Sequence, residues 1–100
     1  MKITFNLESQ GQTRPVDVDL NTLIVAGWAG RDMAAIEHHI EELAELGVPR
    51  PSSVPLYYRI GHNQFTQERV VQVVGPHSSG EVEALVFQAG GQLCLSIASD

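Results

Sequence analysis

Only one stretch of this chain has helical periodicity, and this limits the possible folds more than any other feature. The apolar residues that recur three or four positions apart, as on one face of a helix, are Met33, Ile36, Ile40 and Leu43. Asp32 can cap this helix, because its carboxylate can accept hydrogen bonds from free backbone N–H groups. Gly47 suits the position after the last turn, and Pro49 and Pro51 prevent continuation. The sequence therefore predicts one main helix.

Most of the remaining chain has patterns typical of β-strands. Apolar and polar residues alternate in 3–7 and 16–20, which predicts a hairpin whose loop is "SQGQTRP". The segment "TLIVAGW", residues 22–28, is continuously apolar, which predicts an interior strand covered on both faces. Further strands are expected at 56–60, 69–74, 81–87 and 92–98. Gly90–Gly91 favours a tight turn between the last two.

The fold class predicted from these elements is α+β, mostly β with one main helix and six or seven strands. No repeat or linker divides the chain, so residues 1–100 are expected to form a single domain. Residues 1–21 form its N-terminal β-hairpin, and residues 22–100 form the rest. Because the last predicted strand is followed by no closing element, we expect the domain to be incomplete.

Composition excludes several classes of function. Apolar residues make up 43 % of the chain, which is normal for a globular fold. The net charge is −6 and no basic cluster exists, so nucleic acid and anionic membranes are poor partners. No segment approaches the length of apolar sequence that spans a bilayer. Cys94, the only cysteine, cannot form an internal disulfide, which favours a reduced, cytoplasmic location. Cys94 and Trp28 are both expected in the core.

The adjacent histidines His38 and His39 are the first candidates for chemistry. On a helix, Glu42 is within reach of either imidazole, because it follows them by four and three residues. His39 lies at the border of the apolar face, and His38 points more to solvent. A His–Glu pair at the edge of a cavity can act as a general base, with the carboxylate orienting the ring. The alternative is an ordinary polar helix face. A shared metal ion is disfavoured, because adjacent helical residues diverge by about 100°.

Glu81 and Glu83 are the second candidates. They are two residues apart on a predicted strand, so both carboxylates project from one face. On a buried face such a pair needs a hard cation such as Mg²⁺, whereas on a solvated edge it needs none. Asp100 is a candidate third carboxylate, because the predicted hairpin returns the chain beside Glu81 and Glu83.

The order of these motifs resembles the start of the catalytic domain of the fumarylacetoacetate hydrolase superfamily. In that superfamily a buried strand ends in glycine, a helix carries His-x-x-Glu, and a proline-rich segment leads to a strand. A later strand carries Glu-x-Glu. The similar stretches here are "LIVAGW", "RDMAAIEHHIEELAELGVPRPSSVPLYYRI" and "PHSSGEVEALVF". More closely, the chain resembles a bacterial branch, the domain of unknown function 2848 family. The resemblance covers about residues 22–100, which would then be a hydrolase-like segment.

The resemblance implies a fold, a site and a reaction. The fold would be the N-terminal portion of a fumarylacetoacetate hydrolase-like β-roll. His39 and Glu42 match the dyad that activates water, and Glu81, Glu83 and Asp100 match carboxylates that hold Mg²⁺ or Mn²⁺. The substrate would be a 2-oxo acid or a 1,3-dicarbonyl compound, undergoing C–C bond hydrolysis or decarboxylation. We expect a homodimer.

Two departures from the superfamily pattern leave alternatives open. The helix carries extra residues before the histidines, so His38 with Glu41 is a second register for the dyad. The superfamily's β-roll continues further and includes a catalytic lysine, whereas Lys2 is the only lysine here and lies elsewhere. The resemblance therefore implies a fragment of an enzyme. The alternative is a non-catalytic, β-rich dimerisation or interaction domain.

Overall fold

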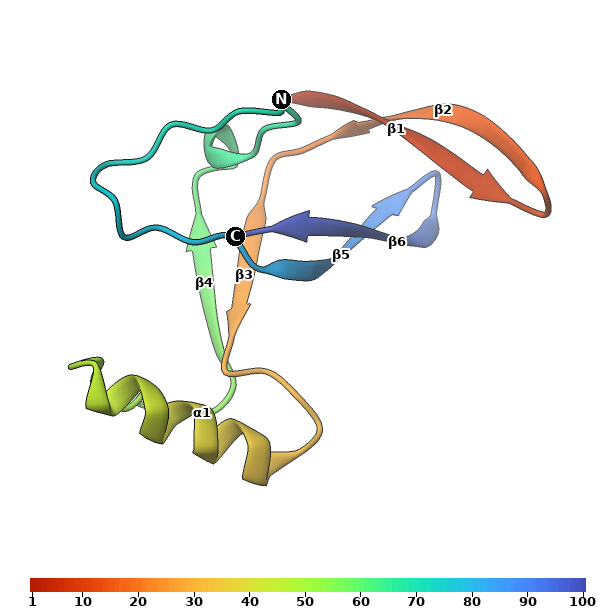
Figure 1. Cartoon of the computed structure of the whole chain (residues 1–100). Coiled ribbons are helices and arrows are strands. Elements are labelled where there is room, and N and C mark those ends of the chain that lie inside the picture. Colours follow the sequence, from red (N-terminus) through yellow and green to blue (C-terminus); the bar gives the residue numbers. More distant parts are fainter. The chain divides into compact units, whose positions relative to one another are not determined.

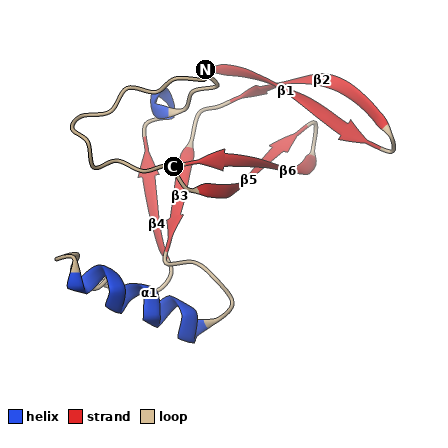
Figure 2. Cartoon of the chain, viewed as in Figure 1, coloured by secondary structure: helices blue, strands red, loops and turns tan.

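The computed structural model describes residues 1–100 and contains one α-helix, one short 3₁₀ helix and six strands (Figure 1, Figure 2). The elements are β1 (Lys2–Ser9), β2 (Gln12–Asp19), β3 (Leu23–Gly27), α1 (Met33–Glu45), β4 (Leu56–Ile60), η1 (His62–Gln64), β5 (Val82–Ala89) and β6 (Gln92–Ser99). The strands form three antiparallel sheets of two strands each. The predicted class is confirmed: the chain is α+β, mostly β with one main helix. It divides into two compact units, residues 1–21 with 61–100, and residues 22–60.

The first unit contains two hairpins that close through two-residue turns. Gln10 and Gly11 have φ of 52° and 73°, and Gly90 and Gly91 have φ of 56° and 78°. Positive φ at both central residues is the type I′ geometry, whose twist matches that of the flanking strands. The predicted Gly90–Gly91 turn is therefore confirmed. The seven-residue loop predicted for the first hairpin is wrong, since β1 continues through Ser9 and β2 begins at Gln12.

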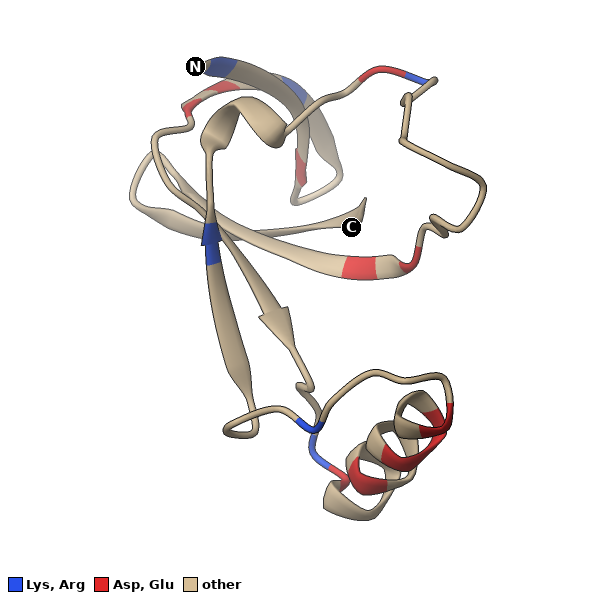
Figure 3. Cartoon of the chain, turned by 90° about the vertical axis from the view of Figure 1, so that its left-hand side faces the viewer, with Lys and Arg blue, Asp and Glu red and all other residues tan.

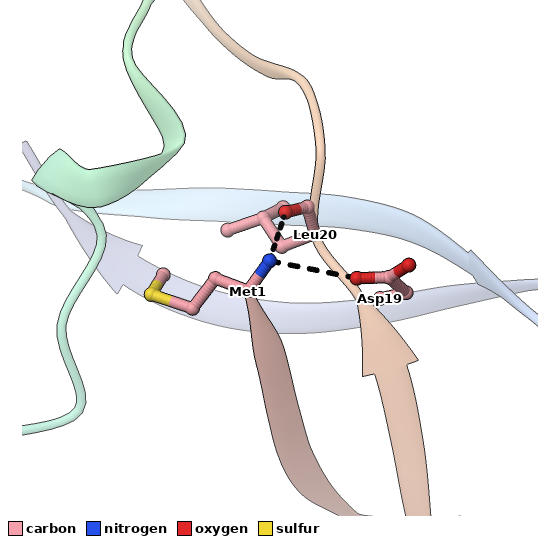
Figure 4. A network of polar contacts seen from close by, with 3 residues as sticks. All are labelled: Met1, Asp19 and Leu20. Carbon is pink, nitrogen blue, oxygen red and sulfur yellow. Dashed lines mark hydrogen bonds and ion pairs between the residues drawn. The ribbon is translucent and has the colours of Figure 1, made fainter.

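The open end of the first hairpin is closed by the first residue of the chain (Figure 4). The Met1 ammonium donates a hydrogen bond to the Leu20 carbonyl over 3.0 Å, and the Leu20 amide donates to the Met1 carbonyl over 2.8 Å. The ammonium also lies 3.5 Å from Oδ1 of Asp19. These contacts extend the β1–β2 pairing by one position.

Aromatic side chains pack between elements of the first unit. The Phe5 ring of β1 stacks on the Phe87 ring of β5 at 4.4 Å, and it meets Phe65 edge-on at 6.5 Å. Cys94 lies opposite Phe87 in the β5–β6 register and is buried, as the sequence predicts. The covered face of the β5–β6 hairpin thus carries Phe87 and Cys94, while the other face is exposed.

The strand predicted at residues 69–74 is wrong. The segment has no regular structure, and Val70 and Val74 are fully or largely exposed. β-rich composition predicts a strand only where a neighbouring strand can pair with the backbone. No strand pairs with this segment, and Gly75 and Pro76 follow it directly.

The strand predicted at 22–28 exists, but its predicted surroundings are wrong. β3 pairs only with β4, in a register that places Val25 opposite Tyr58. Its residues alternate between half-buried and exposed, and Ile24 is 58 % exposed. The apolar run therefore forms a strand of a two-stranded sheet and is not covered on both faces.

The helix α1 begins and ends where the sequence predicts. Oδ1 of Asp32 accepts hydrogen bonds from the amides of Ala34 and Ala35 over 3.0 and 3.2 Å, so Asp32 is the N-cap. Gly47 follows the C-cap with φ +87°, a conformation that glycine adopts without strain. Ile36 and Ile40 are buried, and Ile40 is the most buried side chain in the chain.

Replacing Asp32 with Ala is expected to destabilise the folded chain by about 1 kcal/mol, because two amides of the first turn lose their acceptor. Asp32→Asn is the matched control, since an asparagine oxygen caps nearly as well. Urea unfolding followed by circular dichroism measures both changes. An Ala variant as stable as the Asn variant would contradict the role of the cap.

The charges on α1 oppose its dipole. The helix has no acidic residue in its first turn and no basic residue in its last, while glutamates occupy its C-terminal half (Figure 3). Arg50, in the proline-rich segment after the helix, forms a bidentate ion pair with Glu37, with Nη2 3.0 Å from Oε2. This pair fastens the segment to the helix and lowers the pKa of Glu37 through hydrogen bonding to Arg50.

Because the folded-state pKa of Glu37 is depressed, its pair with Arg50 stabilises the fold above the usual carboxyl pKa of about 4.3. The contribution is lost as the pH falls through the lowered pKa of Glu37. Arg50→Gln is expected to return that pKa towards its usual value, measured by ¹³C NMR titration of the carboxyl carbon. Arg59→Gln removes the same charge from β4 and should leave Glu37 unchanged. Equal effects of the two variants would contradict a local pair.

Candidate functional site

The register of the β5–β6 hairpin brings three carboxylates to one face. Val82 lies opposite Ser99, and Glu83 lies opposite Ala98. One position further on, Glu81 and Asp100 flank the ends of the two strands. Directly opposed residues of an antiparallel pair point to the same face, and so do residues two apart on one strand. Glu81, Glu83 and Asp100 therefore belong to one face, where the small side chain of Ala98 leaves room.

The carboxylate oxygens of Glu81, Glu83 and Asp100 lie within 4.8 Å of one another, and all three residues are exposed. In water, two charges at about 4 Å repel by about 1 kcal/mol, so the cluster can persist without a cation. Around Mg²⁺, oxygens at about 2.1 Å from the ion are at most about 4.2 Å apart. Side-chain movements that shift these oxygens by less than about an ångström would bring all three close enough to bind one ion. Oxygen-only donors also suit hard cations such as Mg²⁺ and Mn²⁺, so the residues fit such an ion.

The carboxylate cluster continues the covered face of the hairpin. Leu85 and Phe87 follow Glu83 at two-residue intervals on this face, and both are half-buried. Across the strand pair they oppose Ser96 and Cys94. The face thus changes along its length from apolar, where the first hairpin packs, to acidic at its open end.

The second candidate site lies on α1. Nε2 of His38 is 3.0 Å from Oε1 of Glu42, and Nδ1 of His39 is 3.7 Å from Oε2 of the same carboxylate. The two carboxylate oxygens of Glu42 therefore each lie near one imidazole. No ion pair joins His38 to Glu41. The side chains of His38 and His39 are 73 % and 53 % exposed, so His39 is the more covered of the two.

With Nδ1 of His39 turned to Glu42, its Nε2 is the nitrogen left to exchange a proton with a bound molecule. A carboxylate beside the ring also stabilises the imidazolium that forms when the proton is taken up. The arrangement can therefore act as a base and then as an acid. In His38 it is Nε2 that faces Glu42. The nitrogen left to exchange a proton is then Nδ1, which lies nearer the backbone.

Trp28, which the sequence predicts to lie in the core, is a neighbour of this site. The structure leaves it half-buried, with its ring centroid 5.5 Å from that of His39 and the planes inclined by 49°. Its φ is +57°, a left-handed conformation that costs an L-residue about 1–2 kcal/mol. The neighbouring glycines in "GWAG" signal a tight turn here, but they do not indicate which residue takes the positive φ.

A groove of about 710 Å³ in the first unit lies between β1 and β6. Its wall includes Phe5, Leu7, Phe87, Cys94 and Leu95. None of the candidate catalytic or metal-binding residues lines it. The groove therefore belongs to the packing between the hairpins.

With the fold and these clusters described, the chain can be compared with known proteins. It is an α+β protein with a carboxylate cluster on one hairpin and a His–Glu cluster on its helix. The family model described as Protein of unknown function (DUF2848) matches residues 26–100, and the chain belongs to this family. No curated protein and no solved structure matches it. Its helices lack the length and apolar character that crossing a membrane requires.

Proposed function

We propose that this chain is part of a bacterial, cytoplasmic, metal-dependent enzyme of the fumarylacetoacetate hydrolase superfamily. Its substrate would be a 2-oxo acid or a 1,3-dicarbonyl compound, and the reaction C–C bond hydrolysis or decarboxylation. The observation that carries the proposal is the convergence of Glu81, Glu83 and Asp100 on one face of the β5–β6 hairpin. The fold would be the first part of that superfamily's β-roll.

In the proposed reaction, His39 takes a proton from water at Nε2. The carboxylate of Glu42, 3.7 Å from Nδ1, offsets the positive charge that the imidazole gains. The hydroxide formed attacks the substrate carbonyl next to the bond that breaks. His39 then returns the proton to the carbon that leaves, so the base is regenerated.

Glu81, Glu83 and Asp100 would hold Mg²⁺ or Mn²⁺ through one oxygen each. When bound, such an ion would chelate the two oxygens of a 2-oxo acid and stabilise the enolate that C–C cleavage leaves behind. The contribution of the chain is the placement of three negative charges on a short, regular hairpin. Their solvent exposure leaves access for a substrate.

The proposal is tested on the protein expressed from its complete reading frame. A panel of short 2-oxo acids and 1,3-dicarbonyl acids is incubated with Mn²⁺ or Mg²⁺, and the products are identified by NMR. We expect turnover that disappears on chelation of the metal and returns when it is restored. Saturable Mn²⁺ binding without turnover of any member of the panel would contradict the enzymatic proposal.

A second function, a non-catalytic dimerisation domain, is favoured by the free edges of the sheets. Every strand has a partner on one side only, so each keeps one unpaired edge. The outer face of the β5–β6 hairpin is also apolar, with exposed residues Val82, Val86, Leu93, Leu95 and Ile97. The occupant would be a second copy: this face carries no charge, so its burial brings no like charges together. The apolar face of α1 is not available for dimerisation, because Ile36 and Ile40 are already buried within the chain.

Sedimentation separates this function from the first. A non-catalytic domain would form a dimer that ignores millimolar Mg²⁺ and dissociates in Leu95→Lys or Ile97→Lys. Val74→Lys adds the same charge at a fully exposed position outside the hairpin and should leave the dimer intact. A monomeric chain, or one that dissociates equally in all three variants, would exclude this interface.

A further inference from the structure

Trp28 has a conformation for which its side chain is poorly suited. Its φ of +57° lies in the left-handed region, where a bulky residue is a rare outlier and glycine would be unstrained. Strained residues of this kind concentrate at functional sites, where the surrounding structure holds them in place. The contacts of the indole at this position are therefore candidates for a functional role.

The turn that contains Trp28 passes near β4 at one end and near α1 at the other. A Cβ on Gly27 would lie 2.9 Å from Cε2 of Tyr58 on β4, so a side chain there would require the tyrosine ring to shift. At Gly30, the corresponding position is 3.5 Å from Cδ1 of Ile36, a buried residue of α1. Trp28 therefore occupies a turn whose two ends contact β4 and α1.

From this turn the indole reaches only one of the two histidines. Its ring centroid lies 5.5 Å from that of His39, whereas no aromatic ring neighbours His38. His39 is thus bounded by the indole and by the carboxylate of Glu42, at 3.7 Å from Nδ1. His38 has Glu42 alone, and its side chain is 73 % exposed.

We infer that Trp28 is a positioning residue that selects His39, not His38, as the working base. Its ring limits rotation of the imidazole, so that Nδ1 stays turned to Glu42 and Nε2 remains free to take a proton. This inference rests on the proposed function of His39. It adds Trp28 as the residue that favours His39 over His38 as the base.

The test uses the full 100-residue chain with ¹⁵N-labelled histidine. In Trp28→Gly, which removes the ring and accepts the positive φ, the preference of His39 for the Nδ1–H tautomer is expected to fall to that of a freely exposed histidine. The His38 signals should stay unchanged, and Trp28→Phe should keep much of the preference. An unaltered His39 tautomer in Trp28→Gly would overturn the inference.

Tryptophan emission provides a measurement that needs no Trp28 variant. Trp28 is the only tryptophan, and a protonated imidazole quenches a neighbouring indole. Its emission should therefore fall as the pH is lowered through the histidine range. This fall should vanish in His39→Gln and persist in His38→Gln. A fall that persists in His39→Gln would also overturn the contact.

Turnover separates this inference from the proposed function. If the enzyme is active, Trp28→Gly is expected to lower kcat on the order of 10- to 100-fold with KM little changed, because the base is misplaced. Trp28→Phe should restore most of kcat. Full kcat in Trp28→Gly would overturn the positioning role while leaving the enzyme proposal intact. A changed tautomer in a protein without any turnover would overturn the enzyme proposal and the part that His39 plays in it.

Discussion

Glu81→Gln is expected to lower the affinity of the chain for Mn²⁺ by more than about tenfold. The substitution keeps the shape of the side chain and removes one of the three charges that converge within 4.8 Å. Affinity of oxygen-donor sites for divalent cations depends strongly on the number of charged ligands. Calorimetry, or the loss of the free Mn²⁺ signal in electron paramagnetic resonance, measures the change.

Glu68→Gln is the matched control for Glu81→Gln. It removes the same charge from the same unit, at a position outside the carboxylate cluster. Its effect should be small, since Glu68 contributes no oxygen to the cluster and salt screens the attraction between exposed charges. If both variants weaken binding equally, the ion is attracted by the net charge of −6 and not by a site. Unchanged affinity in Glu81→Gln would remove the metal assignment.

The second large effect is expected at the histidines. In the protein from the complete reading frame, His39→Gln should lower kcat by about 10²–10⁴-fold, the usual contribution of a general base. His38→Gln should stay within a few-fold of the parent, although His38 is closer to Glu42 in distance. The reason is that the freed Nε2 of His39 extends from the helix, whereas His38 turns its own Nε2 to the carboxylate.

The two histidine variants control for each other, because they lie on adjacent positions of one helix and alter the same type of side chain. Equal losses would indicate that Glu42 must hold both rings. A large loss in His38→Gln alone would assign the base to His38, still paired with Glu42. Activity is followed by product formation at saturating substrate, with KM measured separately.

Local chemistry made much of the fold predictable. The N-cap at Asp32, the left-handed Gly47 and the Gly90–Gly91 turn each depend on a few neighbouring residues. The convergence of Glu81 and Asp100 has the same origin. The two residues are equally distant from a two-residue turn, and regular pairing then places them opposite each other.

The errors arose where distant parts of the chain decide the outcome. The segments at 22–28 and 69–74 both have the composition of a strand, yet only the first finds a partner strand, β4, far along the chain. Periodicity indicates what a strand could bury, but not what will pair with it. Trp28 is a similar case, since the glycines of its turn do not indicate which residue takes the positive φ.

The candidate site was predictable in its residues but not in its contacts. Helical spacing permits Glu42 to approach either histidine, and it does not indicate that one carboxylate reaches both. Those contacts depend on side-chain rotamers, which the surrounding packing selects. The indole beside His39 is one such selecting element.

The pairing of each strand on one side only has a consequence for the exchange of backbone amides with solvent. In a two-stranded antiparallel sheet, alternate N–H groups point towards the partner and the others point outwards. Deuterium uptake should therefore alternate residue by residue along β1, β2, β5 and β6, with every second amide protected. A further chain that pairs with a free edge would protect the remaining half, and the position of the new protection would identify the edge it occupies.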